Sequence, residues 1–136
     1  MTAPYLLDTN ILSDIARNPE GTAADRLRRY EPDAVFTSVI VLAEINYGLA
    51  RNPLTRARRQ ILALLDGIEV RDLPQSAAYH YATMRSELER LGSPVGANDY
   101  WIAAHAMAED AILVSNNLRE FTRVAGLKLE NWVRSF

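Results

Sequence analysis

The sequence predicts an α/β fold with three layers, in which helices cover both faces of a mostly parallel sheet of roughly five strands. Short apolar runs alternate along the chain with stretches of helical periodicity. Stretches of that length suit the crossovers between parallel strands, whereas antiparallel strands need only a tight turn. With 136 residues and no internal repeat, we expect a single domain over residues 1–136.

The first half of the chain alternates between strands and helices. Residues 5–7 form an apolar run that polar residues stop, and apolar residues then recur at helical spacing. Chain-breaking residues on both sides bound a predicted helix over 22–30, and the run 34–37 is typical of a buried strand. Ser38 is a suitable N-cap for a helix that continues to Arg51.

The second half continues this alternation, with prolines, glycines and polar turns between the elements. Helices with regular apolar spacing are predicted over 54–65, 74–91 and 97–109, followed later by a short helix after Asn117. Strands are predicted over 68–70, 111–115 and 127–129.

The composition excludes several classes of protein. The absence of cysteine rules out a disulfide framework, a thiolate zinc site and a cysteine nucleophile. No signal peptide and no apolar stretch of membrane-spanning length are present, so we expect a cytoplasmic protein without membrane contact. Because 15 basic and 17 acidic residues give a net charge of −2, any contact with nucleic acid must be local.

Arginine supplies all but one of the basic side chains, and many of the arginines are clustered. One cluster contains Arg56, Arg58 and Arg59, whose guanidinium groups suit bidentate contact with RNA phosphates. The same residues also suit a solvated helix face. The sequence leaves both interpretations open.

Three carboxylates occupy positions of chemical interest. Asp8 follows the first strand, where parallel sheets bind ligands, although an aspartate is also a good helix cap. Glu44 belongs to a helix whose first turns, Val39–Ala43, are apolar all round, so we expect a buried helix and a partner for Glu44 unless its face reaches solvent. Asp99 shares a face with buried residues, but the helix dipole alone would explain an acid in a first turn.

These acids can converge at one edge of the sheet. Ser115 and Asn117 follow a strand and could join them, or could be ordinary turn residues. Carboxylates about 4 Å apart repel by roughly 4 kcal/mol per pair at an effective dielectric constant of ~20, and a divalent cation removes that repulsion. Oxygen ligands without cysteine or a histidine pair favour Mg²⁺ or Mn²⁺ over zinc.

Longer motifs surround these residues and follow one another in a specific order. They are Tyr5-Leu-Leu-Asp-Thr-Asn-Ile-Leu12, Ser38–Glu44 with Tyr47-Gly48, Gly92–Ala104, Ile112–Phe121 and Val124–Trp132. Together they cover almost the whole chain and resemble the PIN-domain ribonucleases, most closely the VapC toxins of bacterial toxin–antitoxin pairs. The chain departs from the pattern at Ser115, where the family usually has threonine, and at Asn117, where many members have a fourth aspartate.

The resemblance implies a PIN-like fold and a metal-dependent endoribonuclease. Asp8, Glu44 and Asp99 would bind Mg²⁺, for which Mn²⁺ can substitute, and Asn117 would complete the catalytic set. The metal would activate a water molecule for in-line attack on the phosphate, leaving 5′-phosphate and 3′-hydroxyl ends. Structured RNA such as tRNA is the common substrate of the family, and its cleavage inhibits translation.

The resemblance also implies supporting roles. Ser115 would help to orient metal-bound water or the first carboxylate, and Thr9 and Asn10 would support the loop around Asp8. A metal-free mechanism would need a general acid–base pair. The two histidines, His80 and His105, both lie inside predicted helices, where core or surface positions are the more ordinary interpretation.

The resemblance implies an RNA substrate, a cognate VapB-like antitoxin that also binds operator DNA, and a homodimer of this chain in that complex. A second hypothesis is a catalytically weak PIN-like module that holds an antitoxin or RNA, and Asn117 favours it because a carboxylate is missing there. A receiver-like domain is a third. A phosphatase belongs to this third class too. A receiver needs a cluster of acids early in the chain and a lysine near its end; here the one lysine is Lys128, and no phosphate-binding glycine loop is present.

Overall fold

The computed structural model of the chain describes residues 2–52 and 55–133. These residues form one five-stranded sheet with the order β3-β2-β1-β4-β5, and every neighbouring pair of strands is parallel. The strands are β1 (Tyr5–Leu7), β2 (Val35–Ser38), β3 (Glu69–Arg71), β4 (Ile112–Val114) and β5 (Leu129–Glu130). The predicted α/β class and parallel sheet are confirmed.

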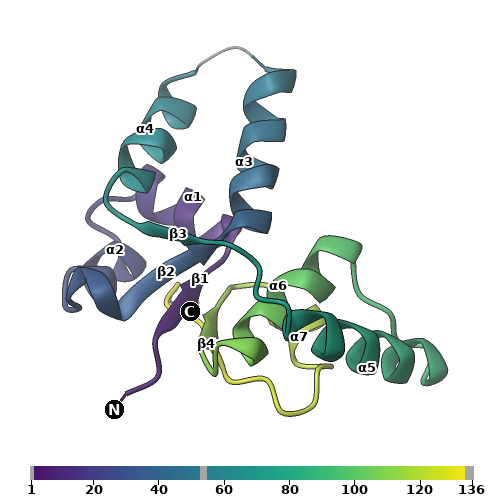
Figure 1. Cartoon of the computed structure of the whole chain (residues 1–136). Helices are drawn as coiled ribbons and strands as arrows, with labels where there is room; N and C mark the ends of the chain where they lie inside the picture. Colours follow the sequence, from purple (N-terminus) through teal and green to yellow (C-terminus); the bar gives the residue numbers. More distant parts are fainter. Residues whose placement is uncertain (1, 53–54, 134–136) are drawn as a thin grey trace.

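Helices cover both faces of the sheet (Figure 1). One face carries α1 (Thr9–Arg17), α2 (Thr22–Leu27) and α4 (Arg56–Leu65), and the other carries α5 (Ala77–Arg90) and α6 (Ala97–Ala108). The helix α3 (Val39–Arg51) projects beyond the sheet together with α4, and we call this pair the arm. A short helix, α7 (Leu118–Phe121), follows β4. None of the helices described is both long and apolar enough to cross a membrane.

Several boundaries differ from the prediction for local reasons. The strand predicted from 34 begins at Val35, because Pro32–Ala34 forms a 3₁₀ turn. The helix predicted from 74 begins at Ala77, whose N–H bonds the carbonyl of Pro74 in a preceding turn. The helix predicted from 54 is α4, but residues 53–54 lie outside the described part of the chain.

The central strands are buried on both faces. Leu6 and Leu7 of β1, Phe36 of β2, and Leu113 and Val114 of β4 are completely inaccessible to solvent. Adjacent residues of a strand point to opposite faces, so the burial of both Leu6 and Leu7 requires cover on each side. Burial of a side chain of this size stabilises the fold by roughly 1.5–3 kcal/mol. The carboxyl ends of β1, β2 and β4 are therefore firmly positioned.

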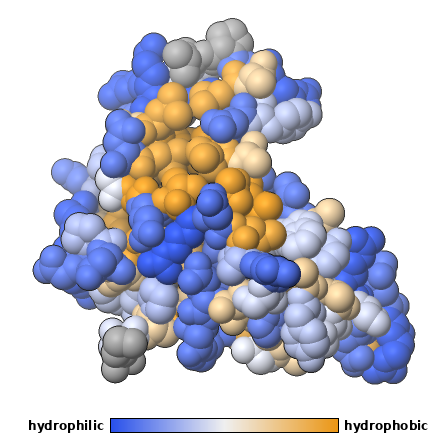
Figure 2. Space-filling model, in the orientation of Figure 1, coloured by the Kyte–Doolittle hydropathy of each residue, from blue (hydrophilic) through white to orange (hydrophobic). Residues whose placement is uncertain are grey.

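The helix α3 is much less buried than its apolar first turns predict. Only Val41 and Ile45 are buried, Ala43 is exposed, and Tyr47 retains 63% of its accessible surface. The expectation of a buried helix is wrong, because the arm extends past the sheet and only one side of α3 meets the core. Apolar side chains consequently gather on the surface of the arm (Figure 2).

Candidate functional site

The predicted site residues meet where the order of the sheet changes direction. From β1 the chain moves outward to β2 and β3, and it then crosses to β4 on the other side of β1. Open parallel sheets bind ligands at such a switch point, beyond the carboxyl ends of the strands. Asp8 follows β1, Ser115 follows β4, and α3, which carries Glu44, follows β2.

Asp8 is both a helix cap and a buried acid. Its Oδ1 accepts a hydrogen bond of 2.9 Å from the N–H of Ile11, and only 4% of its surface is exposed. Burial raises the pKa of Asp8 to about 6, the nearby charge of Glu44 raises it further, and hydrogen bonds from Ser115 and Ile11 oppose this rise. The capping role and the site role predicted for Asp8 are therefore compatible.

Glu44 is half-buried and held by two polar side chains. The hydroxyl of Thr9 donates to Oε1 at 2.6 Å, and the amide of Asn98 donates to Oε2 at 3.4 Å. Among the described residues no cation forms a salt bridge with Glu44. The partner that the sequence required is thus a hydroxyl and an amide, and Asn98 was not singled out from the sequence. The side chain of Asn10 lines the adjacent groove.

Asp99, Asn117 and Glu120 form the opposite side of the site. The amide of Asn117 lies 3.5 Å from Asp99 Oδ2 and 3.2 Å from Glu120 Oε2. Burial raises the pKa of Asp99 to about 8, with further increases from the hydrogen bond and charge of Glu120 and the charges of Glu44 and Asp8. The pKa of Glu120 is lowered chiefly because the Asp99 carboxyl donates a hydrogen bond to it. The two carboxyls therefore share one proton.

Glu120 is a site residue that sequence reasoning missed. It lies on α7, three residues after Asn117, so both side chains project from the same side of that helix. Glu120 supplies the site with a carboxylate, whereas Asn117 supplies only an amide. The three-residue spacing between Asn117 and Glu120 was the feature of the sequence that could have identified Glu120 as a site residue.

Ser115 joins the two sides of the site. It is completely buried, its Oγ accepts a hydrogen bond of 2.9 Å from the N–H of Asn117, and its hydroxyl bonds to the carboxyl of Asp8. A serine therefore connects β4 to both Asp8 and the segment that carries Asn117.

The site concentrates oxygen ligands and negative charge. Four carboxyl groups and one amide converge there, and the raised pKa values of Asp8 and Asp99 reflect burial and mutual repulsion. These donors are oxygen atoms, the type of ligand that a hard divalent cation prefers. Within the described residues no three acids stand close enough to bind one ion together.

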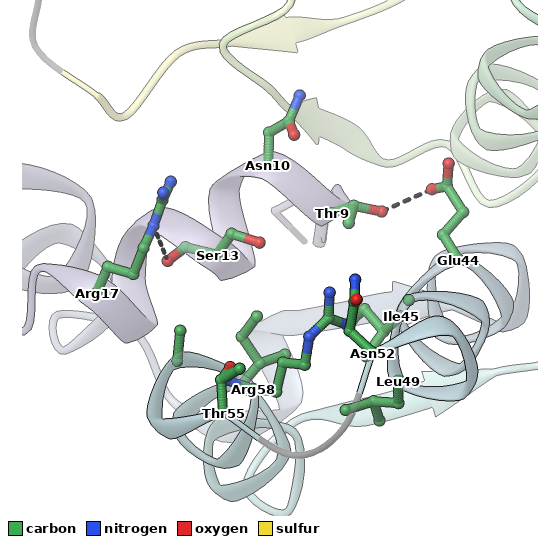
Figure 3. A pocket seen from close by; sticks show the side chains of 13 residues that line it. Thr9, Asn10, Ser13, Arg17, Glu44, Ile45, Leu49, Asn52, Thr55 and Arg58 are labelled. Atoms are coloured by element: carbon green, nitrogen blue, oxygen red, sulfur yellow. Dashed lines mark hydrogen bonds between the residues drawn. The ribbon is translucent and has the colours of Figure 1, made fainter.

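The other predicted residues lie around this centre. Arg58 lines a groove of about 730 Å³ that continues from Glu44 between α1, α3 and α4 (Figure 3), whereas Arg56 and Arg59 are exposed outside it. His105 is completely buried between Ser38 and Glu109. Burial lowers its pKa, so it is a neutral core residue at physiological pH. His80 packs beside Tyr79 on α5.

Replacing Glu120 with Gln is expected to move the pKa of Asp99 down from about 8 toward its ordinary value. The substitution removes a like charge, and the new amide can donate to the ionised form of Asp99. Carboxyl-detected NMR titration measures the shift. Glu20→Gln, at an exposed position outside the site, is the control. An unchanged Asp99 titration in Glu120→Gln would show that the two acids are not coupled.

The chain is similar to proteins of known activity over nearly its whole length. The PIN domain family matches residues 5–127. "Ribonuclease VapC2" of Rickettsia felis is 37% identical over 130 residues, which cover 94% of this chain and 97% of that protein. "tRNA(fMet)-specific endonuclease VapC" of Shigella flexneri is 36% identical over 132 residues, with the same coverage.

Solved structures agree with this relationship. The structure of VapBC2 from Rickettsia felis bound to a DNA fragment from the promoter has a TM-score of 0.83 and 35% identity, and the match covers 94% of this chain and 98% of that one. DNA-bound VapBC from Salmonella typhimurium also gives a TM-score of 0.83, with 33% identity and coverage of 96% and 99%. The chain therefore belongs to the PIN domain family and, within it, to the VapC ribonucleases.

Proposed function

We propose that this chain is a metal-dependent endoribonuclease and the toxin of a toxin–antitoxin pair, formed by one nuclease domain over residues 1–136. The observation that carries this function is the convergence of Asp8, Glu44, Asp99 and Glu120 at the switch point of a PIN-domain sheet. Its relatives named VapC are ribonucleases, and one of them is a tRNA(fMet)-specific endonuclease. We propose structured RNA such as tRNA as the substrate, with inhibition of translation as the consequence.

Asp8, Glu44 and Asp99 would hold Mg²⁺, or Mn²⁺ in its place, with Glu120 as the fourth acid. Such an ion, when bound, lowers the pKa of a coordinated water and neutralises charge on the phosphate. Hydrogen bonds from Thr9 and Asn98 orient the Glu44 carboxylate, and a hydrogen bond from Ser115 orients Asp8. Asn117 holds its amide between Asp99 and Glu120, where it orients both acids. Hydrolysis by this route leaves 5′-phosphate and 3′-hydroxyl ends.

The proton shared by Asp99 and Glu120 makes this site sensitive to its charge state. With a pKa of about 8, the Asp99 carboxyl holds a proton at neutral pH. Carboxylates bind a cation in their ionised form, so Asp99 would have to lose this proton to serve as a ligand. At neutral pH the Asp99 carboxyl thus contributes no negative charge to the site until it loses this proton.

We propose a VapB-like antitoxin as the partner, in a complex that binds operator DNA and contains a dimer of this chain, in the cytoplasm. Solved relatives are VapBC complexes; one is bound to a DNA fragment from the promoter and another is DNA-bound. Apolar side chains gather on the surface of the arm (Figure 2), and Tyr47 of the arm is largely accessible, so this surface suits a protein partner.

Expression of the chain without its partner is expected to arrest growth, and coexpression of an adjacent small open reading frame is expected to restore it. Arrest should vanish in Glu44→Gln, because the amide cannot supply the negative charge of the carboxylate. Growth curves with and without induction measure this, and a blot for soluble protein confirms expression. Arrest that persists with soluble Glu44→Gln would assign the toxicity to another cause.

A catalytically weak binding module is the second candidate, because Asn117 supplies an amide where many family members have an acid. In vitro cleavage of RNA with and without Mg²⁺ or Mn²⁺ separates the two. The proposed nuclease cuts only with the metal. A binding module leaves the RNA intact under both conditions while still binding its antitoxin.

A further inference from the structure

We infer that Arg58, whose guanidinium packs against Gly48 of α3, binds a phosphate of the RNA substrate. This phosphate is a neighbour of the one that lies at the acidic site. The inference rests on the proposed ribonuclease function and assigns to that reaction a substrate-binding residue. The groove beside Glu44, which we call the arm groove, runs between α1 on one side and the arm on the other (Figure 3).

The side chain of Arg58 crosses the arm groove from α4 to α3. A Cβ atom placed on Gly48 would lie 2.7 Å from its Nη1, so any other residue at 48 would displace the guanidinium. Glycine inside a helix is less favourable than alanine by roughly 0.5–1 kcal/mol, and the close approach of Arg58 accounts for it here. Gly48 comes one helical turn, about 6 Å, after Glu44 on the same face. The guanidinium of Arg58 therefore lies beside α3, about one helical turn from Glu44.

The guanidinium of Arg58 is half-buried and has no anionic partner. Within residues 2–52 and 55–133 it forms no salt bridge and no side-chain hydrogen bond, and only the backbone N–H of Arg58 is bonded, to Thr55. Within the same described residues, Arg17 on the α1 side donates only to the carbonyl of Ser13. Arg26, Arg29, Arg71, Arg85 and Arg90 pair with carboxylates. Arg56 and Arg59 also form no salt bridge with the described residues, but they lie outside the arm groove. The arm groove thus offers two unneutralised cations.

The charge of the arm groove favours an anionic strand. Among its described lining residues Glu44 is the one acid, and it belongs to the acidic site. Beyond Glu44 the fixed charges are Arg17 and Arg58, although the whole chain carries a net charge of −2. An RNA strand with one phosphate at the acids would continue into the arm groove and bring a neighbouring phosphate to Arg58.

The polar lining of the arm groove also suits RNA. Asn10, Ser13 and Asn52 place amide and hydroxyl groups along it. Such groups can donate to and accept from the 2′-hydroxyl and the base edges of a single strand. The apolar residues Ile45 and Leu49 form part of the lining, where a peptide could pack, so a segment of the antitoxin is the competing occupant that the experiment must separate.

Two variants test Arg58 in different ways. Arg58→Gln removes the charge, whereas Gly48→Ala keeps it and displaces the guanidinium. Arg56→Gln and Arg59→Gln are matched controls, because both lie on α4, are exposed and do not line the arm groove. A fluorescent single-stranded RNA is titrated into each protein over a range of salt concentrations, in an Asp99→Asn background that prevents cutting.

Arg58→Gln and Gly48→Ala are each expected to weaken RNA binding about tenfold, the loss typical of one charged hydrogen-bonded contact. The slope of log affinity against log salt concentration should fall by about 0.7 in Arg58→Gln. With Asp99 intact, KM should rise while kcat changes little. The control variants should stay near the parent protein, and unchanged thermal melting of Gly48→Ala would exclude misfolding.

Three outcomes would overturn the inference. Equal losses in Arg58→Gln and Arg59→Gln would mean that only overall charge matters. Normal RNA binding with weakened antitoxin binding in Arg58→Gln would mean that the arm groove holds a peptide. A wild-type protein that neither binds nor cuts RNA would refute both this inference and the proposed function, whereas cleavage unaffected by Arg58→Gln would refute this inference alone.

Discussion

Asp99→Asn is expected to reduce metal-dependent RNA cleavage on the order of a hundred- to a thousandfold, as when one preorganised group of a catalytic site is removed. The same change should leave the metal-free protein equally or more stable. Burial raises the pKa of Asp99 to about 8, together with the hydrogen bond and charge of Glu120 and the charges of Glu44 and Asp8. Asparagine keeps the shape of the side chain and carries no charge that must be buried at any pH.

The competing explanation is that Asp99 only stabilises the first turn of α6. Asp25 provides a matched control, because it is also a first-turn acid, on α2, and pairs with Arg29 at the surface. Asp25→Asn should cost at most about 1 kcal/mol and leave cleavage intact. Melting curves with and without Mn²⁺ complete the comparison, since stabilisation by a ligand follows RT ln(1 + [L]/Kd). An Asp99→Asn protein that still cuts and still gains stability from Mn²⁺ would remove Asp99 from the site.

Asp8→Asn is expected to change how stability depends on pH. The pKa of Asp8 is about 6 in the folded protein and near its ordinary value of 3.8 in the unfolded chain. The folded state therefore binds the proton more tightly, and this contribution to stability is full below about pH 4 and is lost as pH rises through about 6. Asparagine carries no charge to bury, and it preserves the cap because its oxygen can still accept from Ile11.

The variant should match the wild type below about pH 4 and exceed it in stability on the order of 2 kcal/mol above about pH 6. Chemical denaturation in chelator at a series of pH values measures this difference. Asp33→Asn, an exposed acid in the turn before β2, should show no such trend. Parallel stability curves for Asp8→Asn and the wild type would contradict the buried-acid interpretation.

Local pattern was sufficient to predict the sheet and two sides of the candidate site. Apolar runs identified the strands, and polar residues at their carboxyl ends identified Asp8 and Ser115. Because parallel strands end at the same edge of a sheet, their convergence could be expected without coordinates. Asp99 was recognisable from its place in a first turn that also faces the core.

The acid Glu120 and the amide Asn98 required the folded structure. Asn98 meets Glu44 across 54 residues of sequence, and Thr9 meets it across 35. Spacing within one helix says which side chains share a face, but not which face another element approaches. Glu120 therefore remained inconspicuous on a four-residue helix until its contact with Asn117 and Asp99 was visible.

The sequence alone determined the order of the elements, the parallel sheet and the acids at its edge, because each depends on residues close together in the chain. Tertiary structure decided the burial of α3 and the separation of Arg58 from Arg56 and Arg59. An apolar helix is buried only as far as the core extends, and the arm reaches beyond it. Three arginines on one helix look alike in sequence, and they differ only because the rotation of α4 turns Arg58 toward Gly48.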